Sequence, residues 1–254
     1  MNLRGIILNT FREAVRNKVF YLLVFLGILF ALGSRIISLL TISDTVKVLK
    51  DSGLAAITFF AVLIAIFVGI NLVYKEIEKK TIFNILSKPI SRNQFIVGKF
   101  LGLALTLLVA LAIMALIFLA FLLLQTGRID LGILIYLGLL YLELLILTAI
   151  SLLFSSFSTP ILSSIFTISI FLIGHVTWTF NQFRDRLTQP LSKAVAHLFY
   201  YLLPNLEKFN VKDAVVMGQA IDGRHVLSCL LYALAYVLAI LALAMVIFRR
   251  REFQ

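Results

Sequence analysis

Apolar residues follow one another along this chain in six long runs, which are separated by stretches rich in charged and polar residues. Each run is near or above the ~20 residues that an α-helix needs to cross ~30 Å of hydrocarbon. The pattern therefore predicts an all-α integral membrane protein with six transmembrane helices. We expect the spans at residues 19–40, 54–74, 95–124, 131–157, 161–178 and 226–248.

A shorter helix of another kind is predicted at residues 1–18. Mostly apolar residues recur with the three- and four-residue spacing of an α-helix and so form one face, while charged residues, mostly arginine, lie on the other side. A two-faced helix of this kind lies flat at the membrane interface. The residues of the predicted buried face are Leu3, Ile6, Ile7, Thr10, Phe11, Ala14 and Val15.

The segment of residues 179–225 is too polar to span a membrane and too apolar to stand free in water. Part of it forms a helical stripe that ends at Pro204. We expect one or two short helices at the outer interface, between the fifth and sixth spans. The residues of the stripe are Leu191, Val195, Leu198, Phe199 and Leu202.

The composition excludes a soluble protein. Hydrophobic residues make up 61% of the 254 positions and the mean hydropathy is +1.06, against roughly 45–50% apolar residues in soluble domains. We therefore expect one transmembrane domain over residues 1–254. The net charge of +11 does not indicate a nucleic-acid partner, because the basic residues gather at the ends of the apolar runs and form no groove with aromatic residues.

Lysine and arginine are distributed unevenly between the two sides of the predicted bundle. The N-terminal end carries four, residues 75–99 carry six and the C-terminal end carries three, against four in the short loops of the other side. Short loops rich in basic residues face the cytoplasm. We expect a multi-pass protein of a prokaryotic cell membrane with both termini in the cytoplasm.

The sequence contains no pattern typical of a catalytic, cofactor or metal site. No phosphate-binding loop of the form Gly-x-x-x-x-Gly-Lys-Ser/Thr occurs, so we expect no ATPase within the chain. The three histidines have no acidic or thiol companions at ligand spacing. Cys229, the single cysteine, is interpreted as a small apolar residue of the last helix.

Glu143 lies in the middle of the fourth span, where a charged side chain costs at least about 2.5–3.5 kcal/mol. One interpretation makes it a lining residue of a translocation path, together with Asn71 or near Arg35. The other makes it a helix-to-helix hydrogen-bond partner that only supports packing. The sequence leaves both open.

Residues 74–100 contain the most informative polar stretch. Written as a helix, residues 75–88 have an apolar face, which includes Ile82 and Leu86, and a polar one. Pro89 ends this helix, and Ser91 is placed to cap the next one. Such a helix, joined firmly to two spans, is either a lever for a cytoplasmic partner or a surface helix among lipid headgroups.

The pattern Glu76-x-Glu78-x-x-Thr81-x-x-x-x-Leu86-x-x-Pro89-x-Ser91-Arg92, followed by Lys99 and Gly102, resembles the cytoplasmic loop of type-2 ATP-binding-cassette exporter permeases. The resemblance extends to the N-terminal amphipathic helix, the six-span layout and the Pro204-Asn205-Leu206-Glu207 turn. Around residues 204–210 it is nearest to the permeases of nitrous-oxide-reductase maturation systems.

The resemblance implies a permease that moves substrate outward by alternating access, driven by a separate ATPase subunit. It further implies a homodimer with two ATPase copies, a coupling helix that docks on the ATPase, and no cofactor. The residues assigned to coupling in this way are Glu76, Glu78, Thr81, Ile82, Leu86, Pro89, Ser91 and Arg92.

Two other functions remain open at this point. The chain could relay ATPase motion to an extracytoplasmic partner docked on residues 179–225 without conducting any solute. It could also be a carrier that works without ATP, which would show activity in vesicles from this chain alone.

Overall fold

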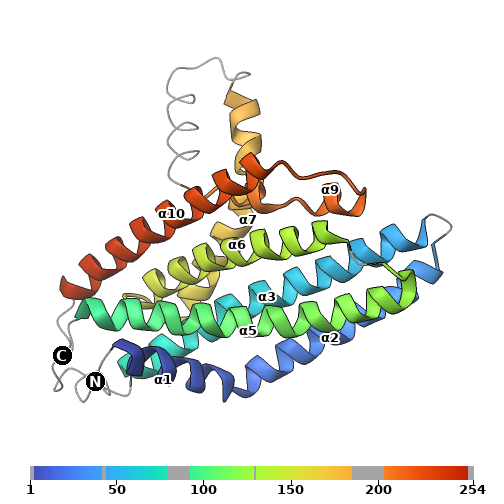
Figure 1. Cartoon of the computed structure of the whole chain (residues 1–254). Helices are drawn as coiled ribbons and strands as arrows, with labels where there is room; N and C mark the ends of the chain where they lie inside the picture. The colour runs from blue at the N-terminus through green and yellow to red at the C-terminus, as the bar shows by residue number, and fades with distance from the viewer. Residues whose placement is uncertain (1–2, 42–43, 79–91, 129, 185–202, 251–254) are drawn as a thin grey trace.

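The computed structural model describes residues 3–41, 44–78, 92–128, 130–184 and 203–250. Within these ranges every regular element is a helix, which confirms the all-α prediction. The elements are α1 (Leu3–Val15), α2 (Lys18–Leu39), α3 (Thr45–Glu78), α5 (Arg92–Thr126), α6 (Leu131–Ser155), α7 (Pro160–Arg184), the 3₁₀ turn η1 (Leu206–Phe209), α9 (Lys212–Val216) and α10 (Gly223–Arg250). Helices α2, α3, α5, α6 and α10 run lengthwise through one bundle (Figure 1).

Among the residues that the structure describes, five helices are long and apolar enough to cross a membrane. They are α2, residues Thr45–Asn71 of α3, residues Asn93–Thr126 of α5, α6, and residues Gly223–Phe248 of α10. The span predicted at residues 161–178 falls on α7, whose apolar part within the described side chains is Pro160–Val176. At about 1.5 Å a residue this part covers about 25 Å, less than the hydrocarbon thickness of ~30 Å. A sixth crossing stays a prediction.

Helix α3 begins nine residues before the span predicted at residues 54–74. The helix can begin there because the Asp44 carboxylate accepts a hydrogen bond from the Val46 N–H at 3.1 Å, which stabilises the first turn. The charged residues before the predicted span therefore lie on α3: Lys47, Lys50 and Asp51.

The other end of α3 continues past the predicted end of the second span to Glu78. Residues 75–78 are thus a direct extension of that span, rather than the start of a separate helix. Helix α5 begins at Arg92. The remaining residues predicted for coupling lie outside the described part of the chain: Thr81, Ile82, Leu86, Pro89 and Ser91.

Helix α1 packs against the first turns of α5. Ile6, Thr10 and Ala14 are buried, in agreement with the predicted two-faced helix. The approach is close at Gly102 of α5, where an added Cβ would lie 2.6 Å from the Thr10 Cβ. The buried face of α1 therefore contacts protein, and only the remaining surface of this helix is available to lipid headgroups.

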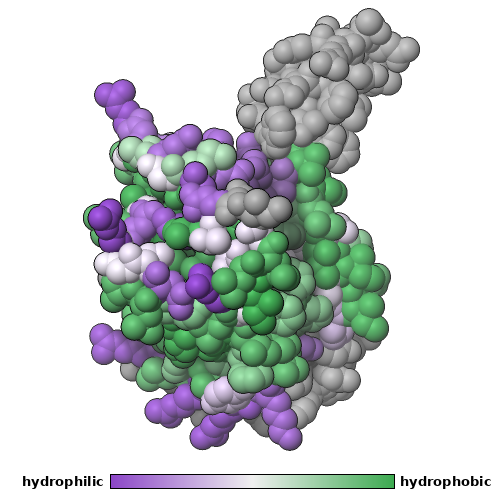
Figure 2. Space-filling view, turned by 90° about the vertical axis from the view of Figure 1, so that its right-hand side faces the viewer, coloured by the Kyte–Doolittle hydropathy of each residue, from purple (hydrophilic) through white to green (hydrophobic). Residues whose placement is uncertain are grey.

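The two ends of the bundle differ in what they carry. At one end, the rings of Phe95 on α5 and Phe248 on α10 stack with centroids 5.6 Å apart, so the last turns of α10 lie near α1 (Figure 1). The opposite end carries α9 and the turn between α5 and α6. Gly127 lies in this turn and has a positive φ of 68°. Viewed from that opposite end, hydrophilic residues stand among hydrophobic ones (Figure 2).

Candidate functional site

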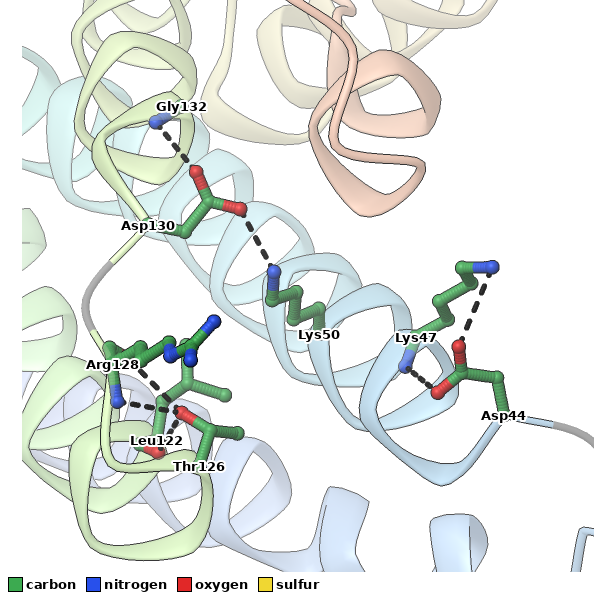
Figure 3. A network of polar contacts seen from close by, with 8 residues as sticks. All are labelled: Asp44, Lys47, Lys50, Leu122, Thr126, Arg128, Asp130 and Gly132. Carbon is green, nitrogen blue, oxygen red and sulfur yellow. Dashed lines mark hydrogen bonds and ion pairs between the residues drawn. The ribbon is translucent and has the colours of Figure 1, made fainter.

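Charged side chains of α3 and of the α5–α6 turn meet at the end of the bundle that carries α9 (Figure 3). Lys50 of α3 donates a hydrogen bond to Asp130, with Nζ and Oδ2 2.8 Å apart. The other carboxylate oxygen of Asp130 accepts from the Gly132 N–H at 2.9 Å and caps α6. One carboxylate thus fastens the start of α6 to α3.

We expect Asp130→Asn to lower the free energy of unfolding by up to about 1 kcal/mol at neutral pH, because asparagine keeps the cap but loses the ion pair with Lys50. The hydrogen bond from Lys50 lowers the pKa of Asp130 below its ordinary value of 3.8. A carboxyl whose pKa is lower in the folded state stabilises the fold above its ordinary pKa, and that contribution is lost as pH falls through the folded value.

Denaturant titrations of the purified chain at pH 7, 5 and 3 check this expectation. The difference in free energy of unfolding between wild type and Asp130→Asn should be equal at pH 7 and pH 5 and should shrink at pH 3. Asp44→Asn is the matched control, since Asp44 also caps a helix but its ion-pair partner is the exposed Lys47, at 3.4 Å. A difference for Asp130→Asn that persists at pH 3 would contradict the role of the ion pair.

A second ion pair fastens α9 to the same helix. Lys212 Nζ lies 2.8 Å from Asp51 Oδ1 on α3. The 3₁₀ turn η1 packs on α7, where an added Cβ at Gly174 would lie 2.8 Å from the Leu206 Cγ. Within the described residues, the segment of residues 179–225 contains the short helices η1 and α9. The stripe of residues 191–202 lies outside the described residues, so the outer interfacial helices stay a prediction.

A cavity of about 250 Å³ opens between α3, α6, α7 and the start of α9. Polar side chains line it in spite of its place among apolar helices: Glu143 of α6 and His175 of α7. Asn210 and Lys212, which follow η1 in the chain, line it as well. The remaining lining residues are Ala55, Thr58, Phe59, Tyr136 and Phe171.

Glu143 is buried, with 3% of its surface exposed. Its Oε1 atom has no hydrogen-bond partner, and the His175 Nε2 lies 3.6 Å away. Leaving a buried polar atom unpaired costs about 1–3 kcal/mol, and more when the group is charged. The contact with His175 joins α6 to α7, and the unpaired Oε1 leaves an acceptor for a ligand. The role of Glu143, in a translocation path or in packing, stays a prediction.

The second ring nitrogen of His175 also has a partner. The Nδ1 atom lies 3.1 Å from the carbonyl oxygen of Phe171. A carbonyl oxygen only accepts, so the Nδ1 atom carries a proton, and the Nε2 atom is the ring nitrogen that faces Glu143.

Asn71, the other residue predicted for a translocation path, is half-buried on α3 and does not line this cavity. It lies about 20 Å further along the helix axis than Thr58, at about 1.5 Å a residue. Arg35 does not line the cavity either. Of the predicted path residues, only Glu143 belongs to this site.

The backbone positions predicted for ATPase coupling gather at the other end of the bundle. Residues 76 and 78 are in the last turn of α3, and residue 92 is the first of α5. Both helix ends lie at the end where α1 and the last turn of α10 are found (Figure 1).

Sequence reasoning missed His175 and Lys212 as members of the site. His175 was considered only as a metal ligand, and within the described residues no group of three or more potential metal-binding side chains occurs. Its relation to Glu143 joins positions on two different helices, and no spacing in the sequence signals such a contact.

Comparison with known proteins gives one family. The family model described as ABC-2 family transporter protein matches residues 5–253, which is nearly the whole chain. No curated protein matches the chain.

Proposed function

Since the chain belongs to the ABC-2 transporter family and is thus the membrane subunit of an ATP-binding-cassette transporter, we propose that it moves a solute outward by alternating access. The five apolar helices found in the described part of the chain, together with this family, make it a multi-pass membrane protein. The family also implies an ATP-binding partner subunit. In our proposal this partner is the ATPase, and the chain itself is not an enzyme.

The observation that carries the proposal is the cavity at Glu143. A buried carboxylate with an unpaired oxygen beside a cavity of about 250 Å³ fits a solute site, because a ligand supplies the missing partner in one state of the transport cycle. A subunit that only transmitted motion would need no such site. Alternating access requires that the helices lining it, α3, α6 and α7, change their relative positions.

In this proposal the ATPase engages residues 76–92, at the end of the bundle opposite the Lys50–Asp130 and Lys212–Asp51 ion pairs. Helix α3 runs without interruption from Thr45 to Glu78, and it contributes Thr58 to the cavity. A force on its last turn would therefore reach the solute site through one rigid element. Both termini then lie in the cytoplasm, and two copies of the chain with two ATPases enclose the path.

We expect Glu78→Ala and Arg92→Ala each to reduce transport per ATP hydrolysed by roughly tenfold, which corresponds to about 1.4 kcal/mol of coupling free energy. The complex of chain and ATPase, reconstituted in liposomes, allows hydrolysis and solute movement to be measured together. Lys47→Ala is the matched control, because it removes an exposed charge at the opposite end. Full coupling in both the Glu78 and the Arg92 variants would refute this docking position.

A second candidate function also has an observation in its favour. The segment after Pro204 is attached to α3 by the Lys212–Asp51 pair and to α7 by the contact of Leu206 with Gly174. Movement of these helices would be passed on to an extracytoplasmic partner bound there, without solute flux. Loss of function on altering residues 203–222, with no measurable flux in the wild type, would favour this candidate.

We assign no substrate from the resemblance of residues 204–210 to nitrous-oxide-reductase maturation permeases, because the run is short. The chemistry of the cavity is a better guide to the class of solute.

A further inference from the structure

We propose that the Glu143 cavity binds a small organic ammonium ion, a protonated amine that carries an apolar or aromatic body. This inference rests on the proposed function, because it gives the chemical class of the solute that the same cavity takes. Four features of the cavity lead to it: its acceptors, its unpaired carboxylate, its aromatic walls and the charge balance of its lining.

The acceptors define the donor that fits. With the Nδ1 proton of His175 directed to the Phe171 carbonyl at 3.1 Å, Nε2 is the ring nitrogen that can accept a hydrogen bond from a ligand. The Glu143 carboxylate lies 3.6 Å from that nitrogen and accepts as well. An ammonium group has three N–H donors and no acceptor, so it can donate to both atoms at once. A carboxylate or phosphate ligand would face two acceptors and gain no hydrogen bond from either.

The carboxylate needs a positive charge. Glu143 is buried and its Oε1 is unpaired, and a buried charge is costly unless it is paired and hydrogen-bonded. A cationic ligand supplies both the charge and the hydrogen bond. Charge-assisted hydrogen bonds of this kind are roughly twice as strong as neutral ones.

The walls suit the rest of such a ligand. Phe59, Tyr136 and Phe171 line the cavity, and aromatic faces attract organic cations as well as apolar groups. The volume of about 250 Å³ is below the ~300–1,000 Å³ of sites for drug-sized ligands. The ligand is therefore small, on the scale of one ring with a short aminoalkyl group.

The other charged side chains of the lining do not oppose a cation. Lys212 lines the cavity, but its ammonium group lies 2.8 Å from Asp51, so the two charges offset each other. Glu143 is the acidic side chain of the lining with which a cation can pair. A cation is therefore favoured electrostatically over an anion or a neutral molecule of the same shape.

Binding of benzylammonium to the full chain in phosphatidylcholine nanodiscs tests this proposal. Radiolabelled benzylamine at pH 7 should bind saturably, while benzyl alcohol and benzoate should not compete at equal concentration. Glu143→Gln should weaken binding by at least about tenfold, since it removes the charge and keeps the shape. Glu13→Gln makes the same chemical change at the opposite end of the bundle, and we expect it to leave the affinity unchanged.

Two further variants keep the test decisive if Glu143→Gln does not yield folded protein. His175→Phe removes the second acceptor, and Phe171→Leu removes one aromatic face; each should weaken benzylammonium binding several-fold. No saturable binding to the wild type, equal competition by benzyl alcohol, or unchanged affinity in the cavity variants would each overturn the proposal.

Failure of this inference is distinguishable from failure of the proposed function. Ammonium binding is measured on the chain without its ATPase, whereas coupling is measured in the complex. A complex that transports a solute but does not bind benzylammonium would refute the ligand class and leave the permease function intact.

Discussion

Gly53→Ala should lower the free energy of unfolding by about 1–3 kcal/mol. Gly53 lies on α3 and faces the ring of Phe118 on α5, which an added Cβ would overlap. The ring cannot move aside easily, because Phe118 is completely buried. The gain in helix propensity from glycine to alanine, about 1 kcal/mol, is therefore outweighed by the clash.

A double-mutant cycle measures this contact. Phe118→Leu removes the atoms that the new methyl group would meet, so Gly53→Ala should cost less in that background than in the wild type. Gly138→Ala is the matched control, since a Cβ there meets nothing within 4 Å, and we expect it to be neutral or slightly stabilising. Unfolding titrations in detergent give all four free energies. Equal costs for Gly53→Ala with and without Phe118 would show that the overlap is not the cause.

Gly102→Ala should detach α1 from the bundle and reduce coupling to the ATPase. An added Cβ at Gly102 would lie 2.6 Å from the Thr10 Cβ and 2.9 Å from the Ile7 carbonyl oxygen. The second atom belongs to the backbone, so a side-chain rotation cannot relieve the contact and the whole helix must shift. A loss of about 1–3 kcal/mol in α1 docking is expected from overpacking of this size.

This effect should be visible both locally and in function. Arg4 lies on the exposed side of α1. A probe attached to the cysteine of an Arg4→Cys variant should become more mobile when Gly102→Ala is added. Transport per ATP in the reconstituted complex should fall, because α1 lies at the end of the bundle where we place the ATPase (Figure 1). Gly33→Ala on α2, where a Cβ meets nothing within 4 Å, serves as the control. Unchanged probe mobility and coupling in Gly102→Ala would contradict this account of α1.

Much of the helix layout could be predicted from the sequence because lipid imposes a simple rule. Backbone groups must be satisfied within each span, so long apolar runs become helices. Five of the six predicted spans therefore correspond to helices of sufficient length. Helix α3 begins before the span predicted at residues 54–74, because the Asp44 cap and the ion pairs of Lys50 and Asp51 allow the helix to contain charged residues.

The site was only partly predictable for a different reason. Glu143 was identified because a charge within an apolar run is costly wherever it lies. Its neighbour His175 comes from another helix, and Lys212 and Asp51 are 161 positions apart in the numbering. Contacts of this kind depend on how the helices are rotated and packed.

The sequence by itself thus determined that this chain enters a membrane as helices, and that one carboxylate would lie where charge is expensive. Transfer of side chains from water to hydrocarbon depends on their chemistry, residue by residue. Only the tertiary structure decided that an imidazole nitrogen faces this carboxylate across a small aromatic cavity. Such an arrangement depends on the relative orientation of α3, α6 and α7, which side-chain packing sets and periodicity does not encode.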